Sequence, residues 1–235
     1  MSTFVYLLVF IAAGSTYAQK VPVTVYYESL CPDSIKFYTT QLYPTWNSSL
    51  KSFIDLHLVP YGKSNYTRTG DNYTFTCHHG EKECIGNRVQ ACALELIPKN
   101  DMDLKVKYIN CLMSMSKSSG DQYPTKTCSD DVKLGADLLD KIESCSNSNE
   151  GNEYLAALGN MTMKFQNPLV SVPTVVINNQ LDDKDKEAAR TDFKGVLCSL
   201  IKDGKPAECG KSGASGATYP AVLLVTLLLA FTIRL

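Results

Sequence analysis

The chain has 235 residues, of which 44% are hydrophobic, so it can bury a core and is not a disordered protein. Its 23 basic and 24 acidic residues give a net charge of −1, which argues against nucleic-acid binding through a strongly basic surface as the main function. The cysteine count is nine, an odd number. In an oxidising compartment eight cysteines can pair, and one thiol is left over.

The N-terminal segment predicts entry into the secretory pathway. An apolar run over residues 4–13 is followed by Thr16 and Ala18, at the −3 and −1 positions of a cleavage before Gln19. This pattern is typical of a signal peptide over residues 1–18, although no positive charge precedes the apolar run; a buried first helix is the alternative. Four N-glycosylation sequons agree with secretion, and they begin at Asn47, Asn65, Asn72 and Asn160.

The following segments predict a strand, a helix and a second strand. Val21–Tyr27 is rich in β-branched and aromatic residues, which favours a buried strand. Apolar residues from Ile35 to Tyr43 have helical spacing, and Phe53–Val59 predicts the second strand. A parallel pair joined by a crossover helix implies an α/β fold whose sheet is covered on both faces. Residues 63–76 are polar and contain two of the sequons, which predicts an exposed glycosylated loop.

The second half of the chain is predominantly helical in its pattern. Apolar faces at helical spacing occur in Val89–Leu96, Leu104–Met115, Val132–Ile142 and Tyr154–Phe165. A third strand is predicted at Val170–Ile177 with a turn at Asn178-Asn179, and a closing helix at Ala188–Lys202. The predicted domain therefore covers residues 19–211, with a helical insertion at about 77–165.

Cys31 stands where the first predicted strand meets the first predicted helix. Pro32 suits the first helical turn, and the positive end of the helix stabilises a thiolate. A thiolate attacks a disulfide through a mixed-disulfide intermediate. Strand, Cys-Pro-x-x sequence and helix together are typical of the redox site of a thioredoxin-like fold. Cys31 is therefore the candidate nucleophile, and a structural disulfide of Cys31 is the alternative.

The position that often carries a second redox cysteine is occupied by Ser34. Serine can hydrogen-bond the Cys31 thiolate but cannot form the internal disulfide that expels a product, and Asp33 adds a negative charge that disfavours the thiolate. Pro173 lies near the start of the third predicted strand, where this fold places a cis-proline against the active cysteine. Cys31, Ser34 and Pro173 are the candidate catalytic residues.

The C-terminal residues 212–235 predict a membrane attachment. The apolar stretch Ala221–Ile233 is shorter than the roughly 20 residues that span a bilayer as a helix. The small residues of Ser212–Ala217 precede it, and this combination is typical of a glycosylphosphatidylinositol attachment signal. A single-pass anchor that begins near Ala214 is the main alternative.

The segment Cys77-His-His-Gly-Glu-Lys-Glu-Cys84-Ile-Gly-Asn87-Arg-Val-Gln-Ala-Cys92 resembles the signature C-Q-H-G-x2-E-C-x2-N-x4-C of the gamma-interferon-inducible lysosomal thiol reductase family. His78 stands where the family has glutamine. Leu58–Gly62 and the later cysteines also fit, so the resemblance covers about Val21 to Cys209.

The resemblance implies a thioredoxin-like fold with a disulfide-rich helical insertion, and reduction of protein disulfides in acidic endolysosomal compartments. Cys31 matches the attacking cysteine of the family, and Ser34 replaces the resolving one. The other cysteines follow the scaffold pattern of the family: Cys77, Cys84, Cys92, Cys111, Cys128, Cys145, Cys198 and Cys209. Their pairing stays open, with Cys198–Cys209 as a nearest-neighbour candidate.

Two functions follow as expectations. The first is a thiol–disulfide oxidoreductase that uses Cys31 alone, with impaired net reduction, and whose partners are disulfide-containing proteins and a small-thiol reductant. The second is a catalytically inactive binding or immune-type protein, secreted or tethered to the cell surface. A homodimer linked through Cys31 is a third option. The expected location is extracellular, at the cell surface or in the endolysosomal lumen.

No cofactor, metal or nucleic acid is expected. Cysteines and histidines lie close together in the signature segment, but the secretory route favours disulfides and the spacing lacks paired C-x2-C sequences. The residues considered for zinc and set aside are Cys77, His78, His79, Cys84 and Cys92.

Overall fold

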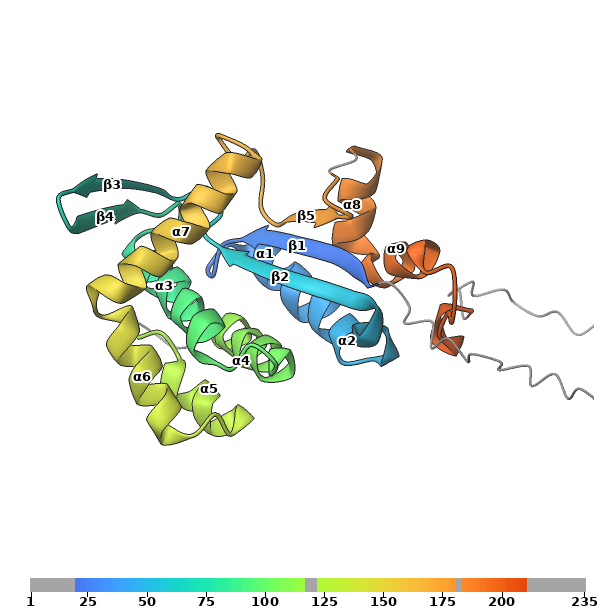
Figure 1. Ribbon diagram of the computed structural model, residues 1–235, viewed down its shortest axis with the longest axis horizontal. Coiled ribbons are helices and arrows are strands. Elements are labelled where there is room, and N and C mark those ends of the chain that lie inside the picture. The colour runs from blue at the N-terminus through green and yellow to red at the C-terminus, as the bar shows by residue number, and fades with distance from the viewer. Residues whose placement is uncertain (1–19, 117–121, 181–182, 211–235) are drawn as a thin grey trace, which may run out of the picture.

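The computed structural model describes residues 20–116, 122–180 and 183–210 (Figure 1). The predicted signal peptide and the predicted C-terminal attachment signal lie outside these ranges. Within the described ranges, no helix combines the length and the apolar character that a membrane crossing requires. A sheet with its own helices lies beside a group of helices contributed by the middle of the chain (Figure 1).

The central sheet contains the three strands expected from the sequence. β1 (Val21–Tyr27) pairs in parallel with β2 (Ile54–Pro60) and antiparallel with β5 (Thr174–Ile177), in the order β2-β1-β5. The third strand begins at Thr174 rather than at Val170 as predicted. Pro173 has no backbone N–H to donate to a neighbouring strand, so pairing starts after it.

The crossover between β1 and β2 is helical but not one regular helix. α1 (Pro32–Phe37) continues into a π-helical turn, Tyr38–Leu42, and then into α2 (Tyr43–Trp46). Pro44 explains the irregularity, because a proline inside a helix removes one i→i−4 hydrogen bond. A 3₁₀ turn, Ser49–Phe53, leads into β2.

Residues 63–76 form a hairpin instead of the predicted loop. β3 (Asn65–Thr69) pairs antiparallel with β4 (Asn72–Thr76) around Gly70, whose φ is +63°. The Tyr66 ring lies 5.6 Å from the Phe75 ring across the pair. Such aromatic cross-strand contacts stabilise a ribbon whose other side chains are largely exposed.

The predicted helical region contains α3 (Glu81–Leu96), α4 (Met102–Met115), α5 (Thr125–Val132), α6 (Ala136–Ser146) and α7 (Asn149–Phe165). The prediction of one continuous helical face over Val132–Ile142 is wrong. Lys133 (φ +58°) and Gly135 (φ +89°) end α5 and begin α6, because left-handed backbone cannot continue a right-handed helix.

The closing helix is likewise divided into α8 (Asp183–Thr191) and α9 (Phe193–Leu200), followed by the 3₁₀ turn Ala207–Cys209. Asp192 separates the two helices and caps the second, since its side chain accepts a hydrogen bond from the Gly195 N–H at 3.0 Å.

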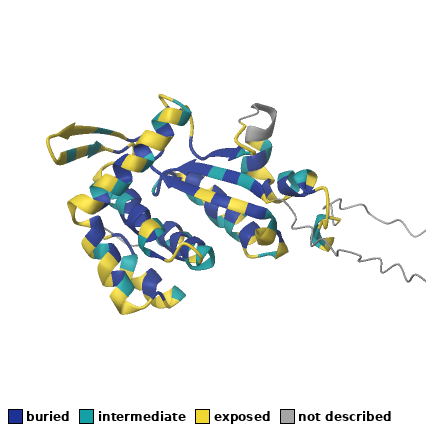
Figure 2. Cartoon of the chain, in the orientation of Figure 1, coloured by how far each residue is buried: buried dark blue, intermediate teal, exposed yellow. Residues whose placement is uncertain are grey.

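Figure 2 shows buried residues in the central strands and along the helices, and these residues form distinct cores. One core packs β1 and β2 against the crossover helices, α4 and α9, and includes Val23, Phe37 and Ile109. A second core lies among α3–α6 and contains four half-cystines. A smaller cluster on the other side of the sheet includes Tyr26, Cys31, Val59, Leu155 and Val172. The candidate nucleophile Cys31 is therefore buried in this cluster.

Candidate functional site

Cys31 is a free, buried thiol at the junction between sheet and helix. It is the N-cap residue of α1, with φ −62° and ψ 123°, and its carbonyl accepts the Ile35 N–H at 2.9 Å. Pro32 occupies the first helical position, as expected from its fixed φ. Among the described residues, which include all nine cysteines, Cys31 is the free one, and it is 7% exposed. The structure therefore does not pair it with the scaffold cysteines.

Ser34 lies one helical turn beyond Cys31 and is completely buried. Its hydroxyl oxygen accepts a hydrogen bond from the Glu28 N–H at 3.3 Å, so it binds the end of β1. The negative charge of Asp33 lies near Arg190 of α8, with 3.8 Å between the Asp33 Oδ2 and the Arg190 guanidinium. The acidic neighbour expected to disfavour a thiolate is thus partly balanced by a cation.

Pro173 follows a cis peptide bond with Val172. Thr174 pairs with Tyr26 near the end of β1, so the register puts Pro173 at the same end of the sheet as Cys31. Val172 and Cys31 belong to the same buried cluster. The cis proline predicted from the sequence is therefore present at the expected end of the sheet.

Glu28, three residues before Cys31, is a completely buried carboxylate. Its Oε1 accepts the Lys63 N–H at 2.7 Å, in the turn that follows β2. Its Oε2 is enclosed and has no hydrogen-bond donor among the described residues. This oxygen faces two imidazoles, with His79 Nδ1 at 3.3 Å and His78 Nδ1 at 3.5 Å.

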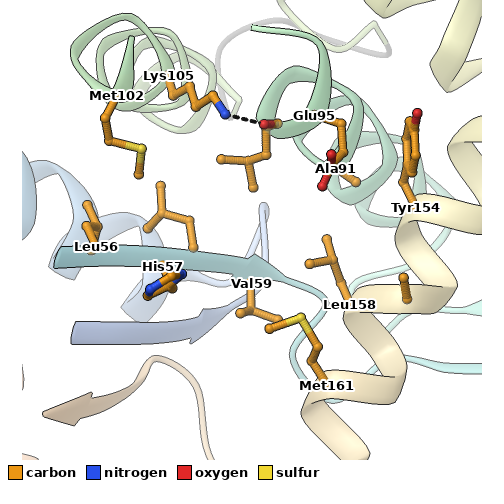
Figure 3. A pocket seen from close by; sticks show the side chains of 13 residues that line it. Leu56, His57, Val59, Ala91, Glu95, Met102, Lys105, Tyr154, Leu158 and Met161 are labelled. Carbon is orange, nitrogen blue, oxygen red and sulfur yellow. Dashed lines mark hydrogen bonds between the residues drawn. The ribbon is translucent and has the colours of Figure 1, made fainter. Parts of the chain in front are cut away.

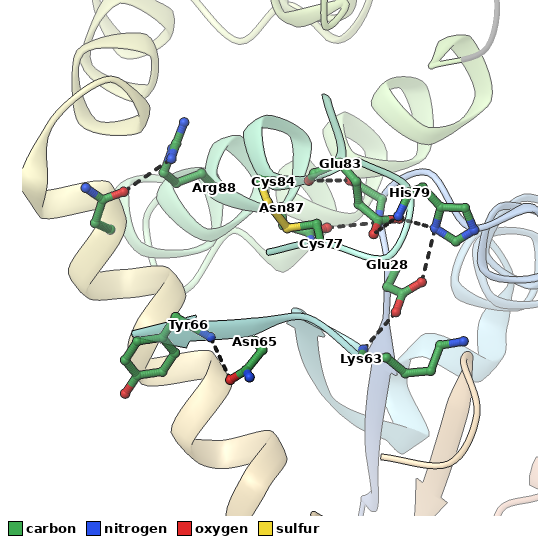
Figure 4. Close-up of a disulfide and its surroundings, with 12 residues drawn as sticks. Glu28, Lys63, Asn65, Tyr66, Cys77, His79, Glu83, Cys84, Asn87 and Arg88 are labelled. Carbon is green, nitrogen blue, oxygen red and sulfur yellow. Dashed lines mark hydrogen bonds and ion pairs between the residues drawn. A yellow bond between two sulfur atoms is a disulfide. The ribbon is translucent and has the colours of Figure 1, made fainter. Parts of the chain in front are cut away.

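The loop before α3 brings His79 to Glu28 (Figure 4). The disulfide Cys77–Cys84 closes this loop onto the first turn of α3. Within it, Glu83 accepts the His79 N–H at 3.0 Å with Oε1, and His79 Nδ1 lies 2.6 Å from Oε2. His79 is thus held between two carboxylates, and its ring is 30% exposed.

Burial raises the pKa of the Glu83 carboxyl, and the neighbouring Glu28 carboxylate raises it further. The hydrogen bonds from His79 and its charge act in the opposite direction. The side chain of Glu83 is completely buried. The two enclosed carboxyl groups, both in contact with His79, make this part of the site favourable for cations.

Further contacts fix α3 to the segment that carries Cys31. The Ser29 N–H donates to Asn87 Oδ1 at 2.9 Å, and Ser29 Oγ donates to the Glu83 carbonyl at 3.2 Å. The Tyr27 hydroxyl donates to Gln90 Oε1 at 2.6 Å. Asn87 belongs to the signature segment, so part of that segment serves to attach α3 to the end of β1.

The sequence interpretation missed Glu28, His79 and Glu83 as members of the site around Cys31. A signal existed for two of them, because His79 and Glu83 are signature positions. Glu28 had a weaker signal, a charged residue directly after a buried strand. Only the folded structure brings these residues to Cys31, because they come from separate elements.

The amino-acid sequence matches a known family over this same region. The family model "Gamma interferon inducible lysosomal thiol reductase (GILT)" matches residues 22–132. The "Gamma-interferon-inducible lysosomal thiol reductase-like protein" of Anopheles gambiae is 42% identical over 97% of this chain and 96% of its own. The chain belongs to the GILT family. "GILT-like protein 1" of Drosophila melanogaster is 39% identical over 90% of this chain and 86% of its own.

The fold of this GILT family member is that of DsbA-type thiol–disulfide oxidoreductases. The Chlamydia trachomatis DsbA structure superposes with a TM-score of 0.51 over 81% of this chain and 97% of its own, at 14% identity. BdbD from Bacillus subtilis gives a TM-score of 0.52 over 77% of this chain and 87% of its own, also at 14% identity. The predicted thioredoxin-like α/β fold is confirmed.

The remaining cysteines of the GILT chain form four disulfides within the described residues. Cys92–Cys145 joins α3 to α6 and Cys111–Cys128 joins α4 to α5, so both lie in the helical region. Cys198–Cys209 is the nearest-neighbour pair considered from the sequence. The three cysteines considered for zinc from the sequence, Cys77, Cys84 and Cys92, are therefore all occupied in disulfides.

The four sequon asparagines, Asn47, Asn65, Asn72 and Asn160, are all exposed. The Tyr66 hydroxyl donates to Asn160 Oδ1 at 2.8 Å, which brings the β3–β4 hairpin next to α7. The hairpin strands themselves carry Asn65 and Asn72.

A cavity of about 270 Å³ lies between β2 and the helices α3, α4 and α7 (Figure 3). Its lining is mainly apolar, and Lys105 Nζ donates to the Leu94 carbonyl at one side. Neither Cys31 nor Glu28 nor His79 lines it. The cavity is thus separate from the thiol site.

Proposed function

We propose that this GILT family member acts on protein disulfides through Cys31 as its single nucleophile. The observation that supports the proposal most directly is the position of the free thiol. Cys31 is the N-cap of α1, at the end of β1 where the cis Pro173 also lies. The helix N-terminus stabilises the developing thiolate.

The reaction begins when the Cys31 thiolate attacks one sulfur of a client disulfide. A bond forms between the two sulfurs, the client S–S bond breaks, and the second client sulfur leaves as a thiolate that takes up a proton. Ser34 has no sulfur with which to resolve this mixed disulfide. Two molecules of a small thiol complete the reduction. The first attacks the mixed disulfide and forms a new mixed disulfide with either the protein or the client, whose former partner leaves as a thiol. The second attacks this new mixed disulfide, releases the remaining thiol and forms the oxidised small-thiol disulfide. A client thiolate can instead attack, which gives isomerisation.

The test is turnover of a disulfide substrate with a small-thiol reductant, compared between the natural protein and Cys31→Ser. We expect turnover by Cys31→Ser to fall to the rate of the uncatalysed reaction, because no other described cysteine is free. Ser34→Ala is the matched control, and it should still form a mixed disulfide that mass spectrometry detects. Equal turnover by the natural protein and Cys31→Ser would contradict the assigned nucleophile.

The second candidate function is a catalytically inactive binding or immune-type protein on the same scaffold. The burial of Cys31 favours it, because a thiol that is 7% exposed meets a client disulfide only after local movement. Ser34 favours it as well, since its hydroxyl contributes to the packing of the Glu28 backbone.

The variant Ser34→Cys separates the two functions. If the site is competent, turnover should rise by roughly tenfold or more, because an intramolecular thiol replaces a bimolecular attack. Ser34→Ala, which restores no thiol, should show no gain. Unchanged turnover in a Ser34→Cys protein with native unfolding behaviour favours the binding function.

The secretory route, the glycosylation of the four sequons and the C-terminal attachment remain predictions. The exposure of all four asparagines supports the glycosylation. Mass spectrometry of the mature protein measures the glycans, both chain ends and the state of Cys31. Non-reducing electrophoresis tests the Cys31-linked homodimer, which must vanish in Cys31→Ser.

A further inference from the structure

The free thiol of Cys31 and two donor atoms of different chemistry lie close together. Glu28, Cys31 and His79 each offer one donor atom, and the three atoms lie within 4.8 Å of one another. Carboxylate oxygen, thiolate sulfur and imidazole nitrogen are the atoms that bind zinc in proteins. They come from the end of β1, the N-cap of α1 and the loop before α3. The fold, rather than the spacing in the sequence, creates this group.

An independent observation indicates that a cation belongs there. Glu28 Oε2 is completely buried and has no hydrogen-bond donor among the described residues, and it is directed at His79. A buried carboxylate oxygen without such a partner is costly, and cation binding relieves that cost. A second buried carboxyl group, that of Glu83, lies next to the group through its contact with His79.

The position of Glu83 also matches a recurring feature of metal sites. An imidazole that binds a metal through one nitrogen usually pairs its other nitrogen with a carboxylate, which fixes the orientation of the ring. Here Glu83 Oε2 lies 2.6 Å from His79 Nδ1, which also faces Glu28 Oε2 at 3.3 Å, so Glu83 fixes the ring and Nε2 is the nitrogen left to bind the cation. The disulfide Cys77–Cys84 holds the loop that carries this pair.

We propose that Glu28, Cys31 and His79 form a binding site for a thiophilic divalent cation such as Zn²⁺. The thiolate ligand selects against Mg²⁺ and Ca²⁺, which prefer oxygen. Three protein ligands leave a fourth position for water. Zinc–ligand distances of about 2.0–2.3 Å put neighbouring ligand atoms below about 4 Å apart, so no pair needs to approach by more than about 1 Å on binding.

A bound cation would mask the nucleophile. Coordination replaces the thiol proton of Cys31, which goes to solvent, and the sulfur is then unable to attack a disulfide. Cation and disulfide substrate therefore compete for one atom. Cation binding requires Cys31 to be reduced but does not require catalysis, so it is expected whether or not the proposed turnover is observed.

The experiment measures Zn²⁺ binding to the mature protein with Cys31 reduced and the other disulfides intact, by competition with a chromophoric chelator. We expect one equivalent to bind, and the affinity to fall at least about tenfold in Cys31→Ser, Glu28→Gln and His79→Gln. His57→Gln is the matched control, because His57 lies on β2, is paired with Asp55 and is exposed. Its affinity should equal that of the natural protein.

A second measurement needs no variant. Zn²⁺ should slow the alkylation of Cys31 at concentrations at which Mg²⁺ has no effect, and a chelator should restore the rate. Natural affinity in both Glu28→Gln and His79→Gln would show binding by the thiol alone and would overturn the site. Absence of protection in the alkylation experiment would overturn it as well.

Discussion

Gly62 shows how a single residue makes room for the buried carboxylate of Glu28. Its φ is +59°, and a Cβ atom built on it would lie 2.2 Å from Glu28 Cγ. The neighbouring Lys63 N–H is the donor to Glu28 Oε1. A residue without a side chain is therefore needed both for the turn and for the approach of Glu28.

Gly62→Ala should lower the free energy of unfolding more than Gly70→Ala does. Gly70 has a similar φ of +63° but nothing within 4 Å of the added Cβ, so it reports the backbone cost alone, about 1–2 kcal/mol. The clash with Glu28 should add about 1–3 kcal/mol. Chemical denaturation of the two variants measures the difference, and equal losses would contradict the role of Glu28 packing.

The residues of the site differ in how far the sequence reveals them. Cys31, Ser34 and Pro173 belong to local motifs at the ends of strands, and each stands at the end of the sheet where the motif predicts it. Glu28 and His79 meet only through the docking of α3 against the end of β1. No local pattern encodes that contact, because it depends on the packing of two separate elements.

Among the elements, the sequence predicts those whose apolar residues form a clear pattern. It does not predict those whose structure depends on a turn or a helix cap. β1 and β2 are rich in buried apolar residues, a local pattern that can be recognised without knowledge of the partner strands. The β3–β4 hairpin is polar, and its signal is Gly70-Asp71 between two tyrosine- and threonine-containing runs. The break between α8 and α9 rests on the single cap Asp192, within a pattern that otherwise continues.

Asp192→Ala should destabilise α9 by about 0.5–2 kcal/mol, because the Gly195 N–H loses its acceptor. Asp192→Asn keeps a capping oxygen and should remain close to the natural protein. Thermal unfolding of the two variants provides the comparison. If asparagine costs as much as alanine, charge rather than capping is responsible.

At the scale of the whole molecule, Asp103 of α4 joins the helical region to the sheet unit. It accepts a hydrogen bond from Trp46 Nε1 at 2.8 Å and pairs with Lys51 Nζ at 2.6 Å. The hydrogen bond from Lys51 is the main cause that lowers the pKa of the Asp103 carboxyl, and the Trp46 bond contributes. Asp103 is 46% exposed, so solvent screens the pair.

A lowered pKa in the folded state means that the Asp103 charge stabilises the protein above the carboxyl's unfolded pKa. That contribution is lost as the pH falls through the folded value. Asp103→Asn should therefore cost about 0.2–1 kcal/mol at pH 7, and the difference should shrink in acid. Urea unfolding midpoints of the natural protein and Asp103→Asn, at pH 7 and at an acidic pH, measure this difference. A difference that does not change with pH would contradict its origin in the Asp103 charge.

The burial of Cys31 also bears on how the chain acquires its disulfides. Cys31 is the first cysteine to leave the ribosome, and all four described disulfides join cysteines that are synthesised after it. While the chain is unfolded, the Cys31 thiol can form a non-native disulfide with any of these later cysteines. Oxidative folding therefore reaches the native pairing only if Cys31 is enclosed, or its wrong bonds are reversed, before the last pair closes. Its burial thus protects the native pairing from disulfide scrambling.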